Sequence, residues 1–195
     1  MKLLKITALS LLLMASYNCK EAKKEAKEVS EEMEETMEEM KEEVSVEKIA
    51  FSMEPKSDSN VAGEVTFTEE NGKVTMTATF SGLTPGEHAI HIHEKADCSA
   101  ADGTSTGGHW NPTAEPHGKW GIEAGYHRGD IGNFTADADG NATLEFSTDL
   151  WCIGCDDETM NIVGKAVIVH QGVDDFTSQP SGAAGARISC TGIIQ

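Results

Sequence analysis

Positive charge is scarce in this chain. Its 195 residues contain 15 Lys and Arg against 33 Asp and Glu, so the formal net charge at pH 7 is -18. Proteins that bind nucleic acid use basic patches to contact phosphates, and electrostatic docking on anionic lipid has the same requirement. The composition therefore argues against a nucleic-acid partner and against binding to a membrane surface through charge.

The N-terminus lacks an apolar run long enough to cross a bilayer, which takes about 20 residues. A short basic segment at residues 1–5 precedes an apolar run at residues 6–14, a pattern typical of a secretory signal. We therefore predict a signal peptide at residues 1–18 and export to the periplasm or cell envelope. Cys19 follows directly and resembles the cysteine of a bacterial lipobox, so a lipid there would anchor the protein to a membrane. A plain signal peptide with an incidental cysteine is the alternative.

Residues 20–48 contain no glycine, proline or aromatic residue. Glu and Lys dominate this segment and favour helix. Apolar residues recur at steps of three or four, which is helical periodicity with a thin apolar stripe: Val29, Met33, Met37, Met40 and Val44. We predict a charged helical spacer over residues 19–48. A weak coiled coil and a Cu(I) site made of Met thioethers are alternatives.

From residue 49 to residue 195 the pattern changes to short alternating segments separated by turn residues, without helical periodicity. Asn71-Gly72 and Asp139-Gly140 are hairpin signals. Long stretches without secondary structure are usually functional, so the stretch 95–129 is predicted to be a functional loop. The pattern favours an all-β antiparallel sandwich or barrel with eight strands, which we expect at 48–53, 61–69, 73–80, 87–94, 131–136, 142–147, 162–170 and 186–194.

Six of the seven histidines lie between residues 88 and 130. On a strand, His91 and His93 would share one face, whereas His88 would lie on the other. Setting His88 aside leaves seven candidate metal ligands: His91, His93, His109, His117, His127, Asp130 and His170. One tetrahedral site uses four ligands, and two sites that share a bridging imidazolate use all seven. An all-histidine site suits Cu(II), and histidines with one carboxylate suit Zn(II). Histidines scattered over a loop surface are the alternative.

The candidate ligands lie in a series of motifs within residues 86–195: His91-Ile92-His93-Glu94, Gly108-His109-Trp110-Asn111-Pro112, His117-Gly118, His127-Arg128-Gly129-Asp130-Ile131-Gly132-Asn133, Val169-His170 and Gly185-Ala186-Arg187-Ile188-Ser189-Cys190. In order and spacing, these motifs resemble copper/zinc superoxide dismutase, an oxidoreductase family. This resemblance implies an eight-stranded Greek-key fold over a domain at 49–195. It also implies copper, as Cu(II)/Cu(I), on His91, His93, His109 and His170, and Zn(II) on His109, His117, His127 and Asp130.

The activity implied by the resemblance is conversion of superoxide to O2 and H2O2 by alternating reduction and reoxidation of copper. His109 would bridge the two metals and carry a proton, Arg187 would guide the anion, and Asp174 would link a copper histidine to a zinc histidine. The segment before Arg187 lacks the lysine-rich guiding loop of longer family members. A non-enzymatic copper-binding or copper-delivery protein on the same fold is the alternative, and a homodimer is left open.

Besides Cys19, the chain contains four cysteines, which form two candidate pairs. The resemblance implies a disulfide between Cys98 and Cys190. Cys152 and Cys155 have no counterpart in the family. A zinc knuckle would need a second such pair, which the chain lacks. A local disulfide is the simplest reading of Cys152 and Cys155, with a redox-active or copper-loading pair as the alternative.

Overall fold

The computed structural model of the chain describes residues 46–195. The predicted signal peptide, the lipidation site at Cys19 and nearly all of the predicted helical spacer lie outside the described residues. The last two positions of that predicted spacer, Glu47 and Lys48, belong instead to the first strand. Within residues 46–195, no helix is long and apolar enough to span a membrane.

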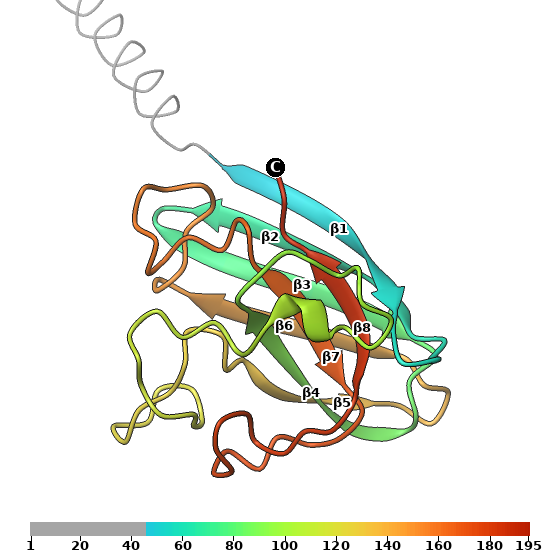
Figure 1. Ribbon diagram of the computed structural model, residues 1–195. Helices are drawn as coiled ribbons and strands as arrows, with labels where there is room; N and C mark the ends of the chain where they lie inside the picture. The colour runs from blue at the N-terminus through green and yellow to red at the C-terminus, as the bar shows by residue number, and fades with distance from the viewer. Residues whose placement is uncertain (1–45) are drawn as a thin grey trace, which may run out of the picture. The chain divides into compact units, whose positions relative to one another are not determined.

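Eight antiparallel strands form the described part of the chain (Figure 1). Their order is β5-β4-β7-β8-β1-β2-β3-β6, and the sheet folds into two layers that form a nearly closed barrel. The strands are β1 (Glu47–Pro55), β2 (Ala62–Glu70), β3 (Lys73–Ser81), β4 (Gly86–His93), β5 (Gly132–Ala136), β6 (Ala142–Thr148), β7 (Ala166–His170) and β8 (Arg187–Gly192). The predicted all-β, eight-stranded class is confirmed. The stretch 95–129 contains a short 3-10 turn, η1 (Thr104–Thr106), and one isolated β-bridge residue, His109.

One layer contains β1, β2, β3 and β6, and the other contains β5, β4, β7 and β8. The layers are joined where the end of β1 pairs with β8, through Glu54 opposite Cys190 and Pro55 opposite Ser189. The alternation in the sequence explains the packing of the first layer. In β3 the residues Val74, Met76, Ala78 and Phe80 point into the core, and the residues between them are exposed or half-buried, as the two-residue period requires.

The central strands of the second layer, β4 and β7, are buried on both faces over most of their length. All five residues of β7 are buried, and β4 is buried from His88 onward. Ile90 and Ile92 pack in the core between the layers, and the opposite face of β4 carries His91 and His93 under a cover of loops. This double burial explains why the sequence of β4 shows histidines at positions where a one-sided sheet would show solvent-exposed residues.

The predicted hairpin around Asp139-Gly140 is present as a turn, but no ladder of hydrogen bonds joins its two strands. The Gly140 amide donates to the Asp137 carbonyl and the Asp137 amide donates to the Asn141 carbonyl, and no residues of β5 and β6 are paired beyond this turn. β5 pairs with β4 and β6 pairs with β3, so the two strands lie at opposite ends of the sheet order. These two ends of the order face each other where the barrel is nearly closed, so the turn joins neighbouring edges of the sheet. The Greek-key crossovers are the connections from β3 to β4 and from β6 to β7. By contrast, the hairpin at Asn71-Gly72 joins β2 and β3 as predicted, with positive φ at both residues.

Four of the few aromatic residues attach the long loop to the barrel. Trp120, in the loop, packs edge-on against Phe146 of β6 and against Trp151, and Tyr126 packs on Trp120. Trp151 is fully buried, and its indole nitrogen donates to the Arg128 carbonyl over 2.9 Å. The loop is therefore fixed to the barrel by packing and by a buried hydrogen bond.

Two disulfides are present. The predicted bond between Cys98 and Cys190 is confirmed; it joins the loop to β8 across 92 positions of the sequence. Cys152 and Cys155 form a second, local disulfide. The first bond lies against the buried residues Ala166 and Ile168 and so secures the loop on the face of the sheet that carries the histidines.

Removal of the long-range disulfide is expected to destabilise the protein far more than removal of the local one. A bond that closes a long loop restricts the unfolded chain most, and its loss costs about 2–5 kcal/mol. Cys98→Ala/Cys190→Ala should therefore lower the free energy of unfolding by about that amount in urea titrations. Cys152→Ala/Cys155→Ala is the matched control and should cost less. Equal losses in the two double variants would contradict this expectation.

Candidate metal centre

The pairing of β4 with β7 brings three histidines together on one face of the second layer. His91 lies opposite Ile168 and His93 lies opposite Ala166, so His170, two residues after Ile168, lies on the same face beside them. The register shifts between Val169 and His170, where β7 pairs with β8. The sequence alone left open how His170 would approach. It does so from the neighbouring strand and not from across the barrel.

The loop supplies the remaining candidates by pairing with the free edge of β4 beyond the end of β5. His109 forms a bridge with His93, and the Trp110 amide donates to the Ile92 carbonyl over 2.8 Å. The Ile92 amide in turn donates to the Gly129 carbonyl over 2.9 Å. A Cβ atom on Gly129 would lie 2.1 Å from the Ile92 oxygen, so only glycine permits this approach. These contacts place His109 and the segment ending at Asp130 against the strand.

Two groups of buried side chains result, each with ligand atoms within 4.8 Å of one another. The first contains His91, His93, His109 and His170, and the second contains His109, His117, His127 and Asp130. His109 belongs to both. These are the two sets that the resemblance implies. His88 lies in neither group. It is buried on the core side, where its Nδ1 is 3.0 Å from the His170 carbonyl oxygen and its Nε2 is 2.8 Å from the Thr84 carbonyl oxygen.

Hydrogen bonds show which nitrogens of the first group remain available. His91 uses Nε2 for Asp174, at 2.8 Å, and its buried Nδ1 has no partner within residues 46–195. His93 uses Nδ1 for the Gly107 carbonyl, at 3.0 Å, and His170 uses Nδ1 for the Gly185 carbonyl, at 3.3 Å. Their Nε2 atoms point at each other, 3.4 Å apart. Each ring is thus held by one nitrogen and presents the other.

The second group is arranged around the carboxylate of Asp130, which is completely buried. Its two oxygens lie 2.8 Å from His109 Nδ1, 3.0 Å from His117 Nδ1 and 3.2 Å from His127 Nδ1. The amides of Gly118 and His127 donate to its Oδ2 and hold the carboxylate in place. His109 therefore turns Nδ1 toward the second group, and its buried Nε2, which has no partner among the described residues, toward the first.

These donor atoms fit bound metal ions. Buried polar atoms are nearly always hydrogen-bonded, yet four ring nitrogens of this cluster have no hydrogen-bond partner within the described residues: His91 Nδ1, His109 Nε2, His117 Nδ1 and His127 Nδ1. All of them point into one of the two groups. An all-nitrogen set beside a set with three nitrogens and one carboxylate is the donor chemistry that suits copper and zinc, respectively.

Burial keeps the histidines of the first group neutral. It lowers the pKa of His93 well below the usual range, and it lowers the pKa of His109 to about 4 and that of His170 to about 3. Burial also lowers the pKa of His91, although Asp174 opposes the shift. Neutral imidazole is the form that coordinates a metal, so at neutral pH these rings are ready to bind.

His117 behaves differently in the metal-free protein. Burial lowers its pKa, but Asp130 and Asp174, which lie at its two ring nitrogens, outweigh burial and raise the pKa to about 9. Burial likewise raises the pKa of Asp130, but the ring nitrogens of His109, His117 and His127 close to its oxygens reverse this effect and hold the pKa well below the usual range. A metal that enters this group therefore displaces a proton from His117.

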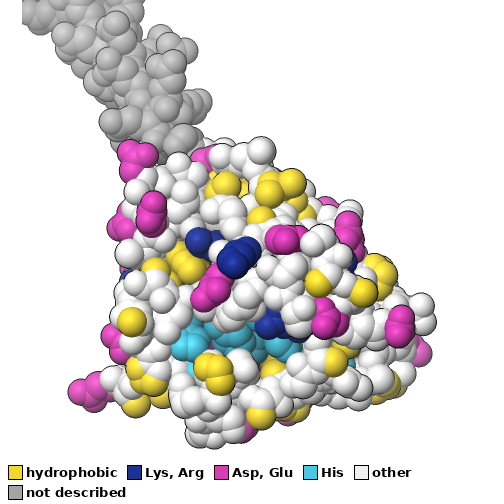
Figure 2. Space-filling view, viewed as in Figure 1, with side chains coloured by type: hydrophobic (Ala, Val, Ile, Leu, Met, Phe, Trp, Pro, Cys, Tyr) yellow, Lys and Arg dark blue, Asp and Glu magenta, His cyan; other side chains and the backbone are white. Residues whose placement is uncertain are grey.

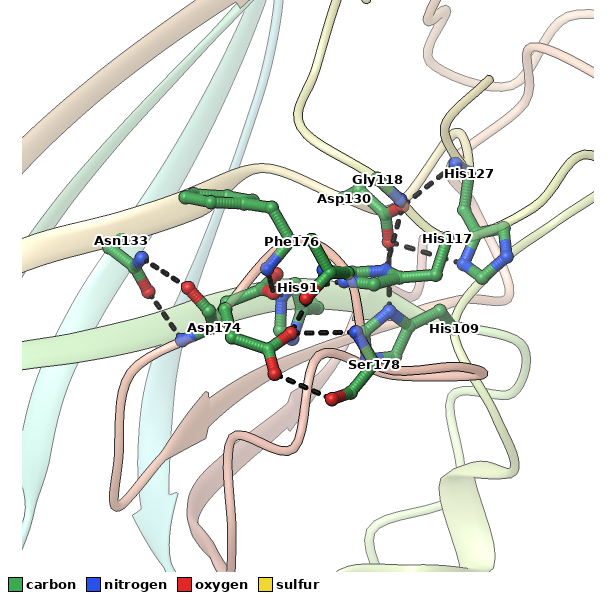
Figure 3. A network of polar contacts seen from close by, with 12 residues as sticks. His91, His109, His117, Gly118, His127, Asp130, Asn133, Asp174, Phe176 and Ser178 are labelled. Atoms are coloured by element: carbon green, nitrogen blue, oxygen red, sulfur yellow. Dashed lines mark hydrogen bonds and ion pairs between the residues drawn. The ribbon is translucent and has the colours of Figure 1, made fainter. Parts of the chain in front are cut away.

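Asp174 connects the two groups, in the position that the resemblance assigns to it (Figure 3). Its Oδ2 lies 2.8 Å from His91 Nε2 and its Oδ1 lies 2.9 Å from His117 Nε2. Asn133 of β5 holds the main chain of Asp174. The Asn133 side chain donates to the Asp174 carbonyl over 2.9 Å and accepts from the Asp174 amide over 2.8 Å. One carboxylate therefore orients a ring in each group, and its own position depends on the barrel.

Arg187, at the start of β8, lies in the wall of a cavity of about 490 Å³ that reaches His93, His109 and His170. Figure 2 shows histidine side chains in a hollow of this face, with acidic and basic side chains along its rim. The Arg187 guanidinium donates to the carbonyls of Gly103 and Gly107 and to the Thr106 hydroxyl, at 2.8 to 2.9 Å. The Gly107 carbonyl is also the partner of His93, so Arg187 is fixed next to the first group.

Comparison with known proteins agrees with this geometry. Residues 61–194 match the family described as copper/zinc superoxide dismutase. The chain belongs to the copper/zinc superoxide dismutase family. A relative named superoxide dismutase [Cu-Zn], from Caulobacter vibrioides, is 39% identical over 142 residues, which cover 71% of this chain and 80% of the relative. The crystal structure of a double mutant of a SOD-like protein from Bacillus subtilis superposes with a TM-score of 0.67 at 30% identity, covering 75% of this chain and 97% of that one.

Membership of the copper/zinc superoxide dismutase family confirms the predicted oxidoreductase activity on superoxide and the predicted copper and zinc cofactors. The same structure contains contacts that the sequence reading did not anticipate. Asn133 lay inside a quoted motif but was given no role. Gln179 and Gly182, which lie against His117 and Asp174, carried no signal in the sequence. Their importance depends on contacts between segments that are far apart in the chain.

Proposed function

We propose that the protein dismutates superoxide with copper held by the first group and zinc held by the second. The observation that carries this assignment is His109, whose two ring nitrogens face different groups. An imidazole shared in this way would hold both metal ions, one through each ring nitrogen. Zinc has no redox chemistry of its own, so its role would be to hold the His109 ring and the loop in place.

Copper in the first group would supply one-electron redox chemistry, as Cu(II) and Cu(I), while two superoxide anions and two protons become O2 and H2O2. The chain's own contribution is positioning and proton transfer. Arg187 lies at the wall of the cavity and would bind the incoming anion through its charge. Nε2 of His109 is directed toward the same group and is the atom at which the chain can hold a proton and release it to the product.

The two aspartates would have different roles, and neither would contact superoxide. Asp130 would coordinate zinc beside the three histidines of the second group, and Asp174 would hold one ring in each group. A carboxylate in the position of Asp174 fixes ring orientation and makes the imidazole a stronger ligand. The strongly acidic chain would repel superoxide at long range, so Arg187 has to act locally.

We also propose that the mature protein is exported and attached to a membrane only through a lipid at Cys19, with residues 19–48 as a spacer before the enzymatic domain. This proposal is supported by the short basic and apolar segments at the N-terminus. Incorporation of an alkyne-labelled fatty acid into the wild type and not into Cys19→Ala would support it. Equal labelling of the two would contradict it. A homodimer is left open.

The function is tested by loading the purified protein with copper and zinc and measuring the removal of superoxide. Arg187→Ile should keep its full metal content but lower kcat/KM about tenfold, because local positive charge raises the rate of anion capture. Arg187→Lys is the matched control. It keeps the charge, so it should retain more activity than the isoleucine variant.

The alternative, a copper-binding protein without enzymatic activity, gives a different result. It would hold copper in both the wild type and Arg187→Ile and remove superoxide with neither. Equal kcat/KM values for the wild type and Arg187→Ile, at equal metal content, would contradict the role proposed for Arg187. Increasing ionic strength should reduce the difference between the isoleucine and lysine variants, because salt screens the charge of a half-buried side chain that solvent can reach.

A further inference from the structure

We propose that Gln179 is a positioning residue for the second metal group, because its side-chain amide holds the main chain of His117. This inference rests on the assignment of His117 to that group under the proposed function. Gln179 lies in the β7–β8 loop, 62 positions from His117 in the sequence. The two segments meet only in the folded protein.

The contact uses both ends of the amide. Oε1 of Gln179 accepts a hydrogen bond from the His117 amide over 2.9 Å, and Nε2 donates to the His117 carbonyl over 2.9 Å. One side chain thereby pairs with the donor and the acceptor of a single residue, as a neighbouring strand would. A pair of bonds to one residue restrains its position and its main-chain direction more than a single bond can.

A second contact from the same loop fixes the opposite end of His117. Asp174 accepts from the ring Nε2 over 2.9 Å, so the loop holds the main chain through Gln179 and the ring through Asp174. The remaining ring nitrogen, Nδ1, faces Asp130 at 3.0 Å. With both ends held, the direction in which His117 presents Nδ1 is set by the β7–β8 loop.

Hydrogen bonds within the β7–β8 loop hold Gln179 in one position. The Asp175 carboxylate accepts from the amides of Thr177 and Ser178 and from the Ser178 hydroxyl. The Gly182 amide donates to the Ser178 carbonyl, and the Asp175 amide donates to the Gly182 carbonyl, which closes the segment. Gln179 lies within this closed turn. The next two residues, at 180 and 181, line the cavity that reaches the first group.

A side-chain amide also holds the main chain of Asp174, the residue that contacts the His117 ring. The Asn133 amide pairs with both main-chain groups of Asp174, just as the Gln179 amide pairs with those of His117. The barrel therefore positions Asp174 through Asn133, and the loop that carries Asp174 positions His117 through Gln179. Gln179 is itself exposed, so its role lies in these two hydrogen bonds and not in filling the core.

The experiment compares Gln179→Ala with Gln171→Ala. Gln171 is an exposed glutamine of the same loop whose side chain makes no hydrogen bond within residues 46–195, so it is a matched control. In Gln179→Ala the zinc dissociation constant, measured by competition with a chelator, should rise about tenfold, as is typical when a group that supports a metal ligand is removed. Copper affinity should stay within about twofold of the wild type, because outer contacts of one site should little affect the other.

Two further readouts separate positioning from general stabilisation. In the metal-free protein the His117 amide should exchange with solvent faster in Gln179→Ala, while amides of the β-strands exchange as in the wild type. The visible spectrum of Co(II) bound in the second group should differ between Gln179→Ala and the wild type. Zinc affinity and His117 exchange that match Gln171→Ala would overturn the inference. Faster exchange throughout the strands would overturn it as well, because Gln179 would then be a general stabiliser.

His117→Ala distinguishes this inference from the proposed function. If zinc binding survives in His117→Ala, the assignment of His117 to the zinc site is wrong, whatever Gln179 does. If His117→Ala loses zinc while Gln179→Ala behaves like Gln171→Ala, only the role of Gln179 is wrong. The exchange of the His117 amide is measured without metal, so it tests the contact independently of zinc.

Discussion

His109→Ala is expected to weaken the binding of both metals and to lower the rate of superoxide dismutation by more than about a hundredfold. This loss is larger than the one expected from removing a residue that only supports a metal ligand. Among the described residues, His109 is the one side chain that belongs to both groups. Its loss removes a nitrogen from the first group and another from the second, and it also removes the proton held at Nε2. Metal content after dialysis, the EPR spectrum of bound Cu(II) and kcat/KM measure the three effects.

Two single-group variants provide the controls. His170→Ala should lose copper and retain zinc, and His127→Ala should do the reverse, because each belongs to one group. The comparison matters because a general collapse of the loop would remove both metals in all three variants. If His109→Ala lost one metal and held the other as tightly as the wild type, His109 would not be shared between the metals.

Gly182→Ala is expected to weaken zinc binding by about 10–100-fold, as loss of a group that orients a metal ligand does. Gly182 has a φ of 67°, and a Cβ atom there would lie 1.9 Å from Asp174 Oδ1 and 2.7 Å from His117 Nε2. Asp174 is buried and already engaged with two histidines, so it cannot move away without giving up a contact. The methyl group would therefore separate Asp174 from His117.

Gly164→Ala is the matched control for this substitution. Gly164 also has a positive φ, of 86°, but no heavy atom lies within 4 Å of a Cβ placed there. It should cost about 1 kcal/mol of stability through backbone strain alone and leave zinc affinity as in the wild type. Chelator competition for zinc and urea unfolding of the metal-free protein separate the two effects. Equal zinc affinities in Gly164→Ala and Gly182→Ala would contradict the steric argument.

The strands and the order of the metal motifs could be predicted because both depend on residues that lie close together in the sequence. Alternation in segments such as residues 73–80 reports one buried face, and the parity of His91 and His93 separates them from His88 on any strand. Ligand number then required two metals with a shared ligand, and the family resemblance supplied the assignment of each histidine. The Cys98–Cys190 disulfide also followed from the resemblance.

Partners that are distant in the chain could not be predicted in the same way. The turn at Asp139-Gly140 gave the correct place for a reversal but did not identify the strands with which β5 and β6 form ladders, because a turn residue reports only the local direction of the chain. The neighbours of β5 and β6 are set by the closure of the barrel. The alternation of buried and exposed residues along a strand does not identify the strand with which it pairs, so the sequence could not distinguish among the possible partners.

The sequence by itself determined the fold class, the family and the set of candidate metal-binding side chains, since these depend on residue type, parity and spacing. The tertiary structure alone decided which nitrogen each histidine presents, because that depends on which nitrogen is already hydrogen-bonded to a residue from another segment. It also placed Asn133, Gln179 and Gly182 against residues of the centre. No role could be assigned to these three from the sequence, because each contacts a residue more than four positions away that only folding brings close.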